Sequence, residues 1–409
     1  MSDHLCEELV DEIFLRLPVK SLVRYRSLSK YWFSYIASPD FIKRHKLLSV
    51  NTPLKLLVKH YPLDPEFWQS RSEFVYTLLS ENRLSLDYQT AVSMDVAEGD
   101  LPCKDFEVVG SCNGILCVVD KQKIFTLWNP SIRRKLTIPL PQRYTADTRD
   151  LRALGFGVDP ITDDYKIVMI SYSQTDPSVY SMKTNTWSII DSPTMPLKKV
   201  MSRACLVNGT LYWVVECTTT EICIMTFDLS INVCGKIEFP EPWDATKKLM
   251  IIKDSLAVLY TECLNEWIWV IEERNNSASW SRVVSSPTYS FYEPVGRVLQ
   301  LSNGDFLLHK YNLGISVCNP LRGESSFPCK YISDVIDMET YAESLVLLDT
   351  GVVFRLNPWF GKKSYPTSDN SLPALTPGSK HDESRQNMKT HVFCFCIFMC
   401  LILYLIVVF

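Results

Sequence analysis

Apolar residues recur at helical spacing near the start of the chain. In "LCEELVDEIFLRL" four of them follow at intervals of four, with acidic residues on the opposite face: Leu5, Leu9, Ile13 and Leu17. Because Pro18 cannot continue a helix, this helix is expected to end there. A second helix is expected in "SLVRYRSLS" with Ser21 as N-cap, and a third in "KYWFSYIAS", stopping before Pro39. The pattern predicts a module of three short helices over residues 1–48, none of them stable alone.

Further along, the apolar positions form short runs separated by turns of Asn, Asp, Ser or Pro. Residues 49–105 are mixed and are expected to connect the helical module to a β domain and to begin it. Two kinds of hairpin then alternate, "GSCNGILCVVD" being one example and "FTLWNPSIRRKLTIP" the other. Six turns of the second kind lie 38 to 56 residues apart, centred on Asn129, Asn185, Ile231, Asn276, Asn319 and Asn357. Two hairpins per period make four strands, the content of one propeller blade.

The fold class predicted from these patterns is α+β multidomain, a small helical domain followed by an all-β, six-bladed propeller-like domain. The β domain is predicted over residues 106–360. A β-sandwich or barrel with irregular hairpins is the alternative, but it would rarely keep so regular a period. Four tryptophans recur with the repeat and are expected to pack between blades: Trp128, Trp187, Trp213 and Trp280.

The C-terminal part of the chain divides into a polar linker, residues 361–391, and an uncharged apolar segment, residues 392–409. Eighteen helical residues span roughly 27 Å, about the thickness of a hydrocarbon core. The segment is interpreted as a membrane tail anchor. A buried strand, or a variant C-terminus without a functional part, are the alternatives.

Composition narrows the class of protein. Hydrophobic residues make up 46% and charged residues 22%, as in ordinary globular proteins, and a formal net charge of -4 does not favour nucleic acid as a partner. The acidic N-terminus lacks the apolar core of a secretory signal. The 14 cysteines fall singly in apolar runs. We therefore expect reduced, packed thiols and a reducing compartment.

Catalytic motifs are missing from the sequence. No nucleophile elbow, zinc-protease motif or phosphate-binding loop occurs, and the six histidines are scattered. The acidic residues of "VDPITDDYK" lack the spacing and central glycine of a calcium loop, so they are interpreted as a hairpin turn. No metal and no cofactor are expected.

The N-terminal residues contain a "RLPVKSL" block, an Arg-aromatic-Arg step, and a Lys-x-Trp that precedes "SPDF". By these motifs they resemble an F-box. The remainder contains "GSCNGILCV", "LWNPSIRRKLTIP", "LGFGVDPITDDYKIV", "VYSMKTNTWSII", "VNGTLYWVV" and "FDLSINVCGKIEFP", in this order. By these motifs most of it resembles the plant F-box-associated, kelch-like domain of type 1. Together they cover residues 4 to 360.

This resemblance implies a non-catalytic substrate receptor of an SCF-type ubiquitin ligase. The F-box would dock on a Skp1-like adaptor, and through it on cullin and RING subunits, while the β domain would bind an unidentified target protein. Residues implied for the adaptor face are Leu5, Leu9, Ile13, Leu17, Pro18, Val19, Leu22 and Trp32. A three-helix module of this size cannot bury all of them, and a leftover apolar patch usually marks an interface. The implied location is the cytoplasm, the nucleus or both, with membrane attachment if residues 392–409 are an anchor.

Two positions depart from the family pattern. Cys6 replaces the usual proline after Leu5, and Ser29 stands where cysteine is common before the Lys-x-Trp. Two other functions remain open at this point. One is a kelch-like scaffold that is not coupled to a ligase and is held on a membrane. The other is a propeller oxidase, which would require clustered His, Tyr and Cys ligands.

Overall fold

The computed structural model describes most of the helical and β regions. The described residues are 7–48, 54–61, 75–80, 94–95, 101–140, 151–171, 176–192, 195–218, 221–240, 246–262, 265–274, 277–286, 295–310, 314–319, 324–326 and 335–346. The apolar segment 392–409 and the polar linker 361–391 lie outside them. Across the described ranges, no helix has the length and apolar character needed to cross a membrane.

Four short helices form the N-terminal module: α1 (Glu7–Leu15), α2 (Val19–Tyr25), α3 (Lys30–Ile36) and α4 (Pro39–Leu48). Helix α1 ends at Leu15, three residues before Pro18, where the sequence placed its end. The prediction for α2 was wrong in its start, because Pro18 and not Ser21 is the N-cap residue. The prediction of three helices was also wrong. Pro39 is the first residue of a fourth helix, α4. At this position the missing N–H of proline removes no hydrogen bond of the helix.

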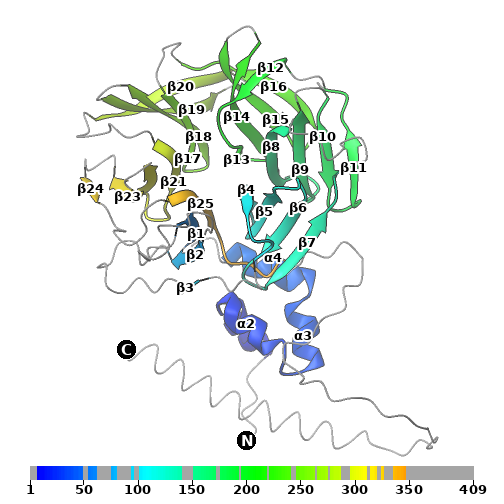
Figure 1. Ribbon diagram of the computed structural model, residues 1–409. Helices are drawn as coiled ribbons and strands as arrows, with labels where there is room; N and C mark the ends of the chain where they lie inside the picture. Colours follow the sequence, from blue (N-terminus) through cyan, green and yellow to red (C-terminus); the bar gives the residue numbers. More distant parts are fainter. Residues whose placement is uncertain are drawn as a thin grey trace, which may run out of the picture. The chain divides into compact units, whose positions relative to one another are not determined.

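The β domain consists of six antiparallel sheets arranged around a common centre (Figure 1). The first blade contains β4 (Phe106–Cys112), β5 (Ile115–Asp120), β6 (Phe125–Asn129) and β7 (Arg134–Ile138). The second contains β8 (Leu151–Val158), β9 (Tyr165–Ser171), β10 (Ser178–Ser181) and β11 (Thr186–Ile189). The third contains β12 (Leu197–Val200), β13 (Cys205–Val207), β14 (Thr210–Cys217), β15 (Ile222–Asp228) and β16 (Val233–Ile237).

The remaining blades complete the ring. The fourth contains β17 (Thr246–Ile252), β18 (Ser255–Glu262), β19 (Asn265–Arg274) and β20 (Ser277–Ser286). The fifth contains β21 (Val295–Gln300), β22 (Phe306–Lys310), β23 (Gly314–Asn319) and β24 (Glu324–Ser326). The sixth joins the last described strand to the first three in the order β25 (Val335–Tyr341), β1 (Lys55–His60), β2 (Val75–Ser80) and β3 (Met94–Asp95). The prediction of a six-bladed propeller behind a helical domain is confirmed.

The sixth blade differs from the sequence prediction. Strand β25 pairs antiparallel with β1, so that Met338 lies opposite Val58, about 280 residues earlier in the chain. The first strand of the β domain thus begins at Lys55, within residues 49–105, which were expected to connect the helical module to the β domain and to begin it. Residues 342–346 lie inside the predicted β domain but form no strand. The last predicted hairpin, around Asn357, lies outside the described residues.

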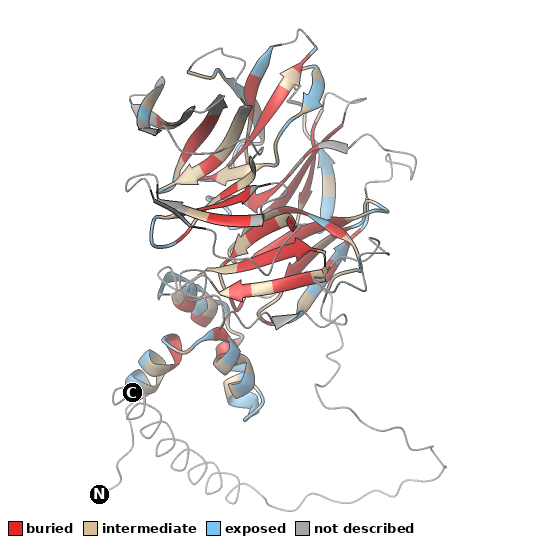
Figure 2. Ribbon diagram, turned by 60° about the vertical axis from the view of Figure 1, so that its left-hand side comes forward, coloured by how far each residue is buried: buried red, intermediate tan, exposed pale blue. Residues whose placement is uncertain are grey.

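Hydrophobic clusters fill the seams between neighbouring blades. Every one of the six seams has its own cluster of buried side chains, from the first–second seam around Phe125 and Phe156 to the sixth–first seam around Tyr76 and Trp128. Buried residues accordingly run along the middle of the sheets in Figure 2. Burial of these faces between sheets is the main stabilising contribution available to the β domain.

The tryptophans link blades as predicted. The indole N–H of Trp213, in the third blade, donates to the Leu154 carbonyl of the second over 2.9 Å. Trp187 on β11 donates to the Pro139 carbonyl at the end of the first blade (2.8 Å), and Trp280 on β20 to the Glu238 carbonyl at the end of the third (3.1 Å). An aromatic with one polar edge satisfies a carbonyl of the neighbouring blade while its rings fill the seam.

Asp159 confirms the interpretation of "VDPITDDYK" as a turn. Its Oδ1 accepts the backbone N–H groups of Ile161 (2.9 Å) and Thr162 (3.2 Å), which closes the turn between β8 and β9. Its Oδ2 accepts from Lys166 Nζ over 3.0 Å. The same ammonium donates to the carbonyl oxygen of Leu229 (2.5 Å) in the third blade. The buried ion pair therefore ties the second blade to the third.

Because of this ion pair, we expect the free energy of unfolding to decrease as the pH falls into the acid range. Burial alone would raise the pKa of Asp159, but hydrogen bonds from Thr162 and Lys166 outweigh it and lower the pKa to about 2, below the ordinary value of 3.8. A carboxyl with a depressed pKa contributes stability that is complete above its unfolded pKa and is lost as the pH falls towards 2. We expect Asp159→Asn to be less stable than the wild type at about pH 6 and to lose less stability between about pH 6 and pH 3. Denaturant unfolding at the two pH values measures this, and parallel losses in both proteins would contradict it.

Candidate functional site

The helical module is held together by caps and by one buried histidine. Ser29 Oγ accepts from the backbone N–H of Trp32 over 3.2 Å at the start of α3, and Ser38 Oγ accepts from that of Phe41 over 3.3 Å at the start of α4. Such caps satisfy backbone donors that a helix start leaves free. His45 Nε2 donates to the carbonyl of Leu17 over 3.0 Å. Helix α4 therefore fixes the chain directly before Pro18.

The core of the module takes apolar side chains from its helices. From Leu15 onward the buried ones are Leu15, Val19, Leu22, Ile36 and Phe41. Phe41 packs its ring near that of Tyr35, with centroids 5.1 Å apart, and near the His45 imidazole at 6.1 Å. These contacts leave several apolar side chains of the helices in solvent.

The eight residues predicted for the adaptor face fall into three groups. Leu9, at 55% exposure, and Pro18 are exposed, while Ile13, Leu17 and Trp32 are partly exposed. These five can contact a partner without unfolding of the module. Leu5, together with the neighbouring Cys6, lies outside the described residues.

Val19 and Leu22 are placed differently from the prediction. Leu22 has 0% exposure and Val19 is also buried, so neither belongs to an exposed face. The reason is that α2 starts directly at Val19, which turns positions 19 and 22 together to its inner side. Their part in adaptor binding would be to support the helices that carry the exposed residues.

Besides Leu47 and Leu48 at the end of α4, three exposed apolar side chains of the module were not among the predicted site residues: Leu28, Tyr31 and Phe33. They lie in and just before α3. The Arg26 guanidinium lies 4.6 Å from the centre of the Phe33 ring, and the Tyr31 ring stacks on that of Tyr35 at 6.0 Å. The sequence carried a signal for them, since "YWFSY" has more large apolar residues than one face of a short helix can bury.

Elsewhere, titratable side chains serve structure. Three histidines form hydrogen bonds within the fold: His45 with the Leu17 carbonyl, His60 with Thr77 Oγ1 at 2.9 Å, and His309 with the Val335 carbonyl at 2.7 Å. Within the described part of the chain, no three His, Cys, Asp or Glu side chains come together as a metal site. The described cysteines are free thiols, and burial raises the pKa of Cys112 to about 11.

The comparisons with known proteins match both parts of the chain in the order predicted. The model of the F-box domain matches residues 2–44, and the model of the F-box associated beta propeller domain matches residues 71–344. The chain belongs to the F-box proteins with an associated β-propeller domain. The predicted family resemblance is thereby confirmed. Proteins of this family are non-catalytic substrate receptors of ligase complexes.

Relatives from Arabidopsis thaliana share this organisation along most of their length. The chain is 28% identical over 352 residues to the F-box/kelch-repeat protein At3g23880, covering 83% of this chain and 94% of the relative. It is 26% identical over 333 residues to the F-box protein CPR1, covering 70% of this chain and 76% of the relative. An F-box in this arrangement implies binding to Skp1 within an SCF complex.

Proposed function

We propose that this chain is the substrate-recognition subunit of an SCF-type E3 ubiquitin ligase. Its F-box docks on a Skp1-like adaptor, which connects it to cullin and RING subunits, and its propeller binds a target protein for ubiquitination and degradation. The observation that carries the proposal is the presence, in one chain, of an F-box match directly ahead of an F-box associated propeller match.

The geometry of the F-box supports the proposal. Leu9 and Pro18 are exposed on the F-box. Burial of their apolar surface against a partner would therefore lower the free energy. The half-buried Ile13, Leu17 and Trp32 offer further apolar area to the adaptor. Burial of such side chains is the usual source of binding energy in helix-mediated interfaces.

The propeller suits target binding because its blades are firmly joined. Closure of β25 on β1 removes two free strand edges, and buried links such as Lys166 to Leu229 fix one blade against the next. Loops on a rigid scaffold can then present a constant surface to a target.

The proposed location follows from the partners. A ligase of this kind and reduced cysteines fit the cytoplasm, the nucleus or both. Attachment to a membrane through residues 392–409 is a further proposal, resting on the uncharged apolar run alone.

A trapping experiment tests the receptor role. Full-length Leu9→Asp keeps the propeller but is expected to lose the ligase, so target proteins should remain bound to it and have longer half-lives in cells that express it. Leu47→Asp changes a somewhat more exposed leucine of α4, outside the predicted face, and serves as the matched control. Quantitative mass spectrometry of captured proteins, with pulse-chase measurement of their half-lives, gives the readout.

The opposite result identifies the alternative function. If proteins bind the wild type, Leu9→Asp and Leu47→Asp equally and their half-lives do not differ, the chain acts as an interaction scaffold that is not coupled to degradation.

A further inference from the structure

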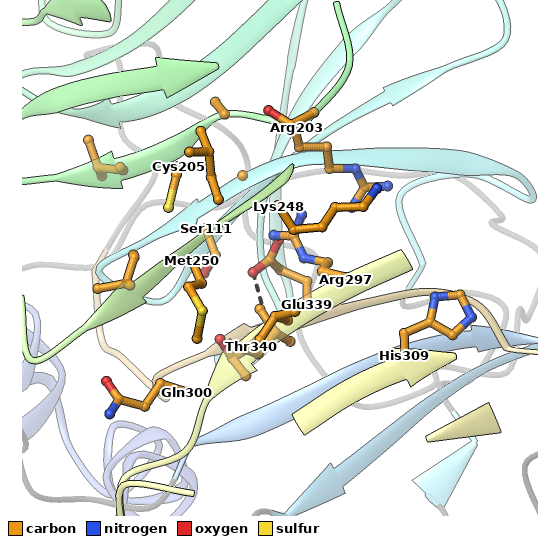
Figure 3. Close-up of a pocket in the computed structure, with 18 of the residues that line it drawn as sticks. Ser111, Arg203, Cys205, Lys248, Met250, Arg297, Gln300, His309, Glu339 and Thr340 are labelled. Atoms are coloured by element: carbon orange, nitrogen blue, oxygen red, sulfur yellow. Dashed lines mark hydrogen bonds and ion pairs between the residues drawn. The ribbon is translucent and has the colours of Figure 1, made fainter. Parts of the chain in front are cut away.

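A cavity of about 680 Å³ lies at the centre of the propeller (Figure 3). One strand of every blade contributes to its wall, with Ser111 from β4, Phe156 from β8, Cys205 from β13, Lys248 from β17, and residues of β21 and β25. Its volume is in the range of pockets that enclose small molecules or single side chains of a partner.

The charges of the wall do not balance. Two ion pairs cross between strands, Arg203 with Asp337 and Arg297 with Glu339. Among the described wall residues the full set of charged side chains has four cations and three carboxylates: Arg203, Lys248, Lys253 and Arg297 against Asp254, Asp337 and Glu339. The lining residues alone therefore carry one net positive charge, while Glu107 acts on Arg203 from outside the wall.

Lys248 is the partly buried cation of the wall that has no ion-pair partner among the described residues, whereas Lys253 is exposed. The pKa of Lys248 is lowered because burial penalises the ammonium form, and no described residue forms a hydrogen bond or ion pair with it. Its charge also lowers the pKa of the buried His309 imidazole, which places the ammonium near the inner wall. A partly buried ammonium without an anion is unfavourable, so this position is suited to an anion from outside the chain.

The unsatisfied polar atoms of the wall point to the same kind of ligand. Among described wall residues, the buried side-chain nitrogen and oxygen atoms that lack a partner are Arg203 Nη1 and Arg297 Nε. Both are donors. The unmet hydrogen-bonding capacity of these buried atoms is therefore on the donor side, which adds to the positive character of this part of the wall.

The opposite part of the wall is apolar. Met250 and Val298 are buried on β17 and β21, and Phe156 and Leu206 contribute further apolar surface. In Figure 3 the side chains of Cys205 and Met250 lie to one side of the charged ends of Arg203, Lys248 and Arg297. The cavity thus has one cationic and one apolar side.

We propose that this central cavity is a binding site for a carboxylate group attached to an apolar body, with Lys248 as the residue that holds the carboxylate. A single unpaired ammonium matches a monoanion better than a phosphate dianion. The carboxylate has two conceivable sources, a free small acid or an acidic side chain of a bound protein, and both present the same chemistry to Lys248. The proposal does not depend on coupling to the adaptor.

Calorimetric titration of the full-length protein tests the site. The probes are 4-phenylbutyrate, its neutral amide, and two blocked tripeptides that have glutamate or glutamine between two phenylalanines. We expect 4-phenylbutyrate to bind at least about tenfold more tightly than the amide, since a charge-assisted hydrogen bond distinguishes them. Lys248→Met should weaken carboxylate binding roughly 10- to 100-fold and leave amide binding unchanged.

Matched variants separate the site from general effects of charge. Lys199→Met removes an exposed lysine of β12 outside the cavity wall and should bind like the wild type. Lys248→Arg keeps the charge and should retain binding. Because Lys248→Met removes an unpaired buried charge, it should melt at or above the wild-type temperature, and it should bind the Skp1-like adaptor normally.

The peptides distinguish the two sources. Tighter, Lys248-dependent binding of the glutamate peptide than of 4-phenylbutyrate assigns the carboxylate to a protein, and the reverse order assigns it to a small acid. Equal affinity for acid and amide, or binding that does not respond to Lys248→Met, would overturn the proposal and leave a water-filled structural cavity.

Discussion

Leu9→Asp is expected to lower the affinity of the full-length chain for a Skp1-like adaptor by roughly 100-fold or more, without lowering its stability. Leu9 is 55% exposed, so an aspartate there remains solvated in the free protein. In a complex that covers this position, the carboxylate would be buried among apolar groups without a partner, in addition to the loss of the leucine contact. Titration calorimetry with purified adaptor measures the change in affinity.

Two further variants make the result specific. Leu47→Asp, at a leucine that is 65% exposed and outside the predicted face, should bind the adaptor like the wild type. Leu22→Ala empties a fully buried position and should destabilise the F-box by about 2–5 kcal/mol, weakening adaptor binding only through unfolding. An equal loss in Leu9→Asp and Leu47→Asp would show that general negative charge, and not the predicted face, governs the affinity.

Gly114→Ala is expected to destabilise the propeller by about 3 kcal/mol or more, the largest effect of any methyl addition at the described turns. Gly114 follows Asn113 in the turn between β4 and β5 and has a φ of 78°, which L side chains rarely adopt. A Cβ here would also overlap the carbonyl oxygen of Ala342 and the hydroxyl of Ser344. Both residues follow β25, so the added methyl would push apart the end of the sixth blade and the first.

The same seam depends on a buried amide. Asn129 donates from Nδ2 to the carbonyl of Ser344 over 3.2 Å and to that of Val346 over 3.0 Å. Displacement of residues 342–346 by the methyl would leave these groups buried without partners, which adds to the cost.

Gly304→Ala is the control for backbone strain. Gly304 has a φ of 87°, but nothing lies within 4 Å of the position of its added Cβ. Its cost should therefore be the strain alone, about 1–2 kcal/mol. Denaturant unfolding of both variants gives the difference. Equal destabilisation would mean that contact between Gly114 and the segment after β25 does not contribute to closure.

Local repeats in the sequence predicted the number of blades but not how the ring closes. The Asn113-Gly114 and Asn208-Gly209 turns each lie within a single hairpin, where short-range sequence preferences decide the conformation. The pairing of β25 with β1 joins residues about 280 positions apart, and no period in the sequence records it. The repeat pattern therefore predicts the sixth blade at the C-terminal end of the repeats, around Asn357.

In the F-box, the sequence predicted which residues are apolar better than which of them face outward. A short helix with apolar residues on more than one side can turn either side inward, and only its packing decides. In α2 the packing buries Val19 and Leu22, whereas in α3 it buries Ile36 and exposes Phe33. Helix α4 was missed because Pro39 is equally compatible with a helix end and, after the capping Ser38, with a helix start.

The central cavity was not predictable from the sequence either. Its charged residues come from four separate blades, and nothing in the neighbourhood of Lys248 in the sequence indicates that its ammonium lacks a partner. Only the closed ring brings Arg203, Arg297 and Lys248 to one wall.

Titration of purified full-length protein with a Skp1-like adaptor tests the central claim most directly. The account predicts one adaptor bound per chain, with a dissociation constant of roughly 1 µM or tighter, and assembly of this pair with cullin and RING subunits into one complex. A chain that melts cooperatively, and is therefore folded, but releases no binding heat and co-elutes with no adaptor would contradict it.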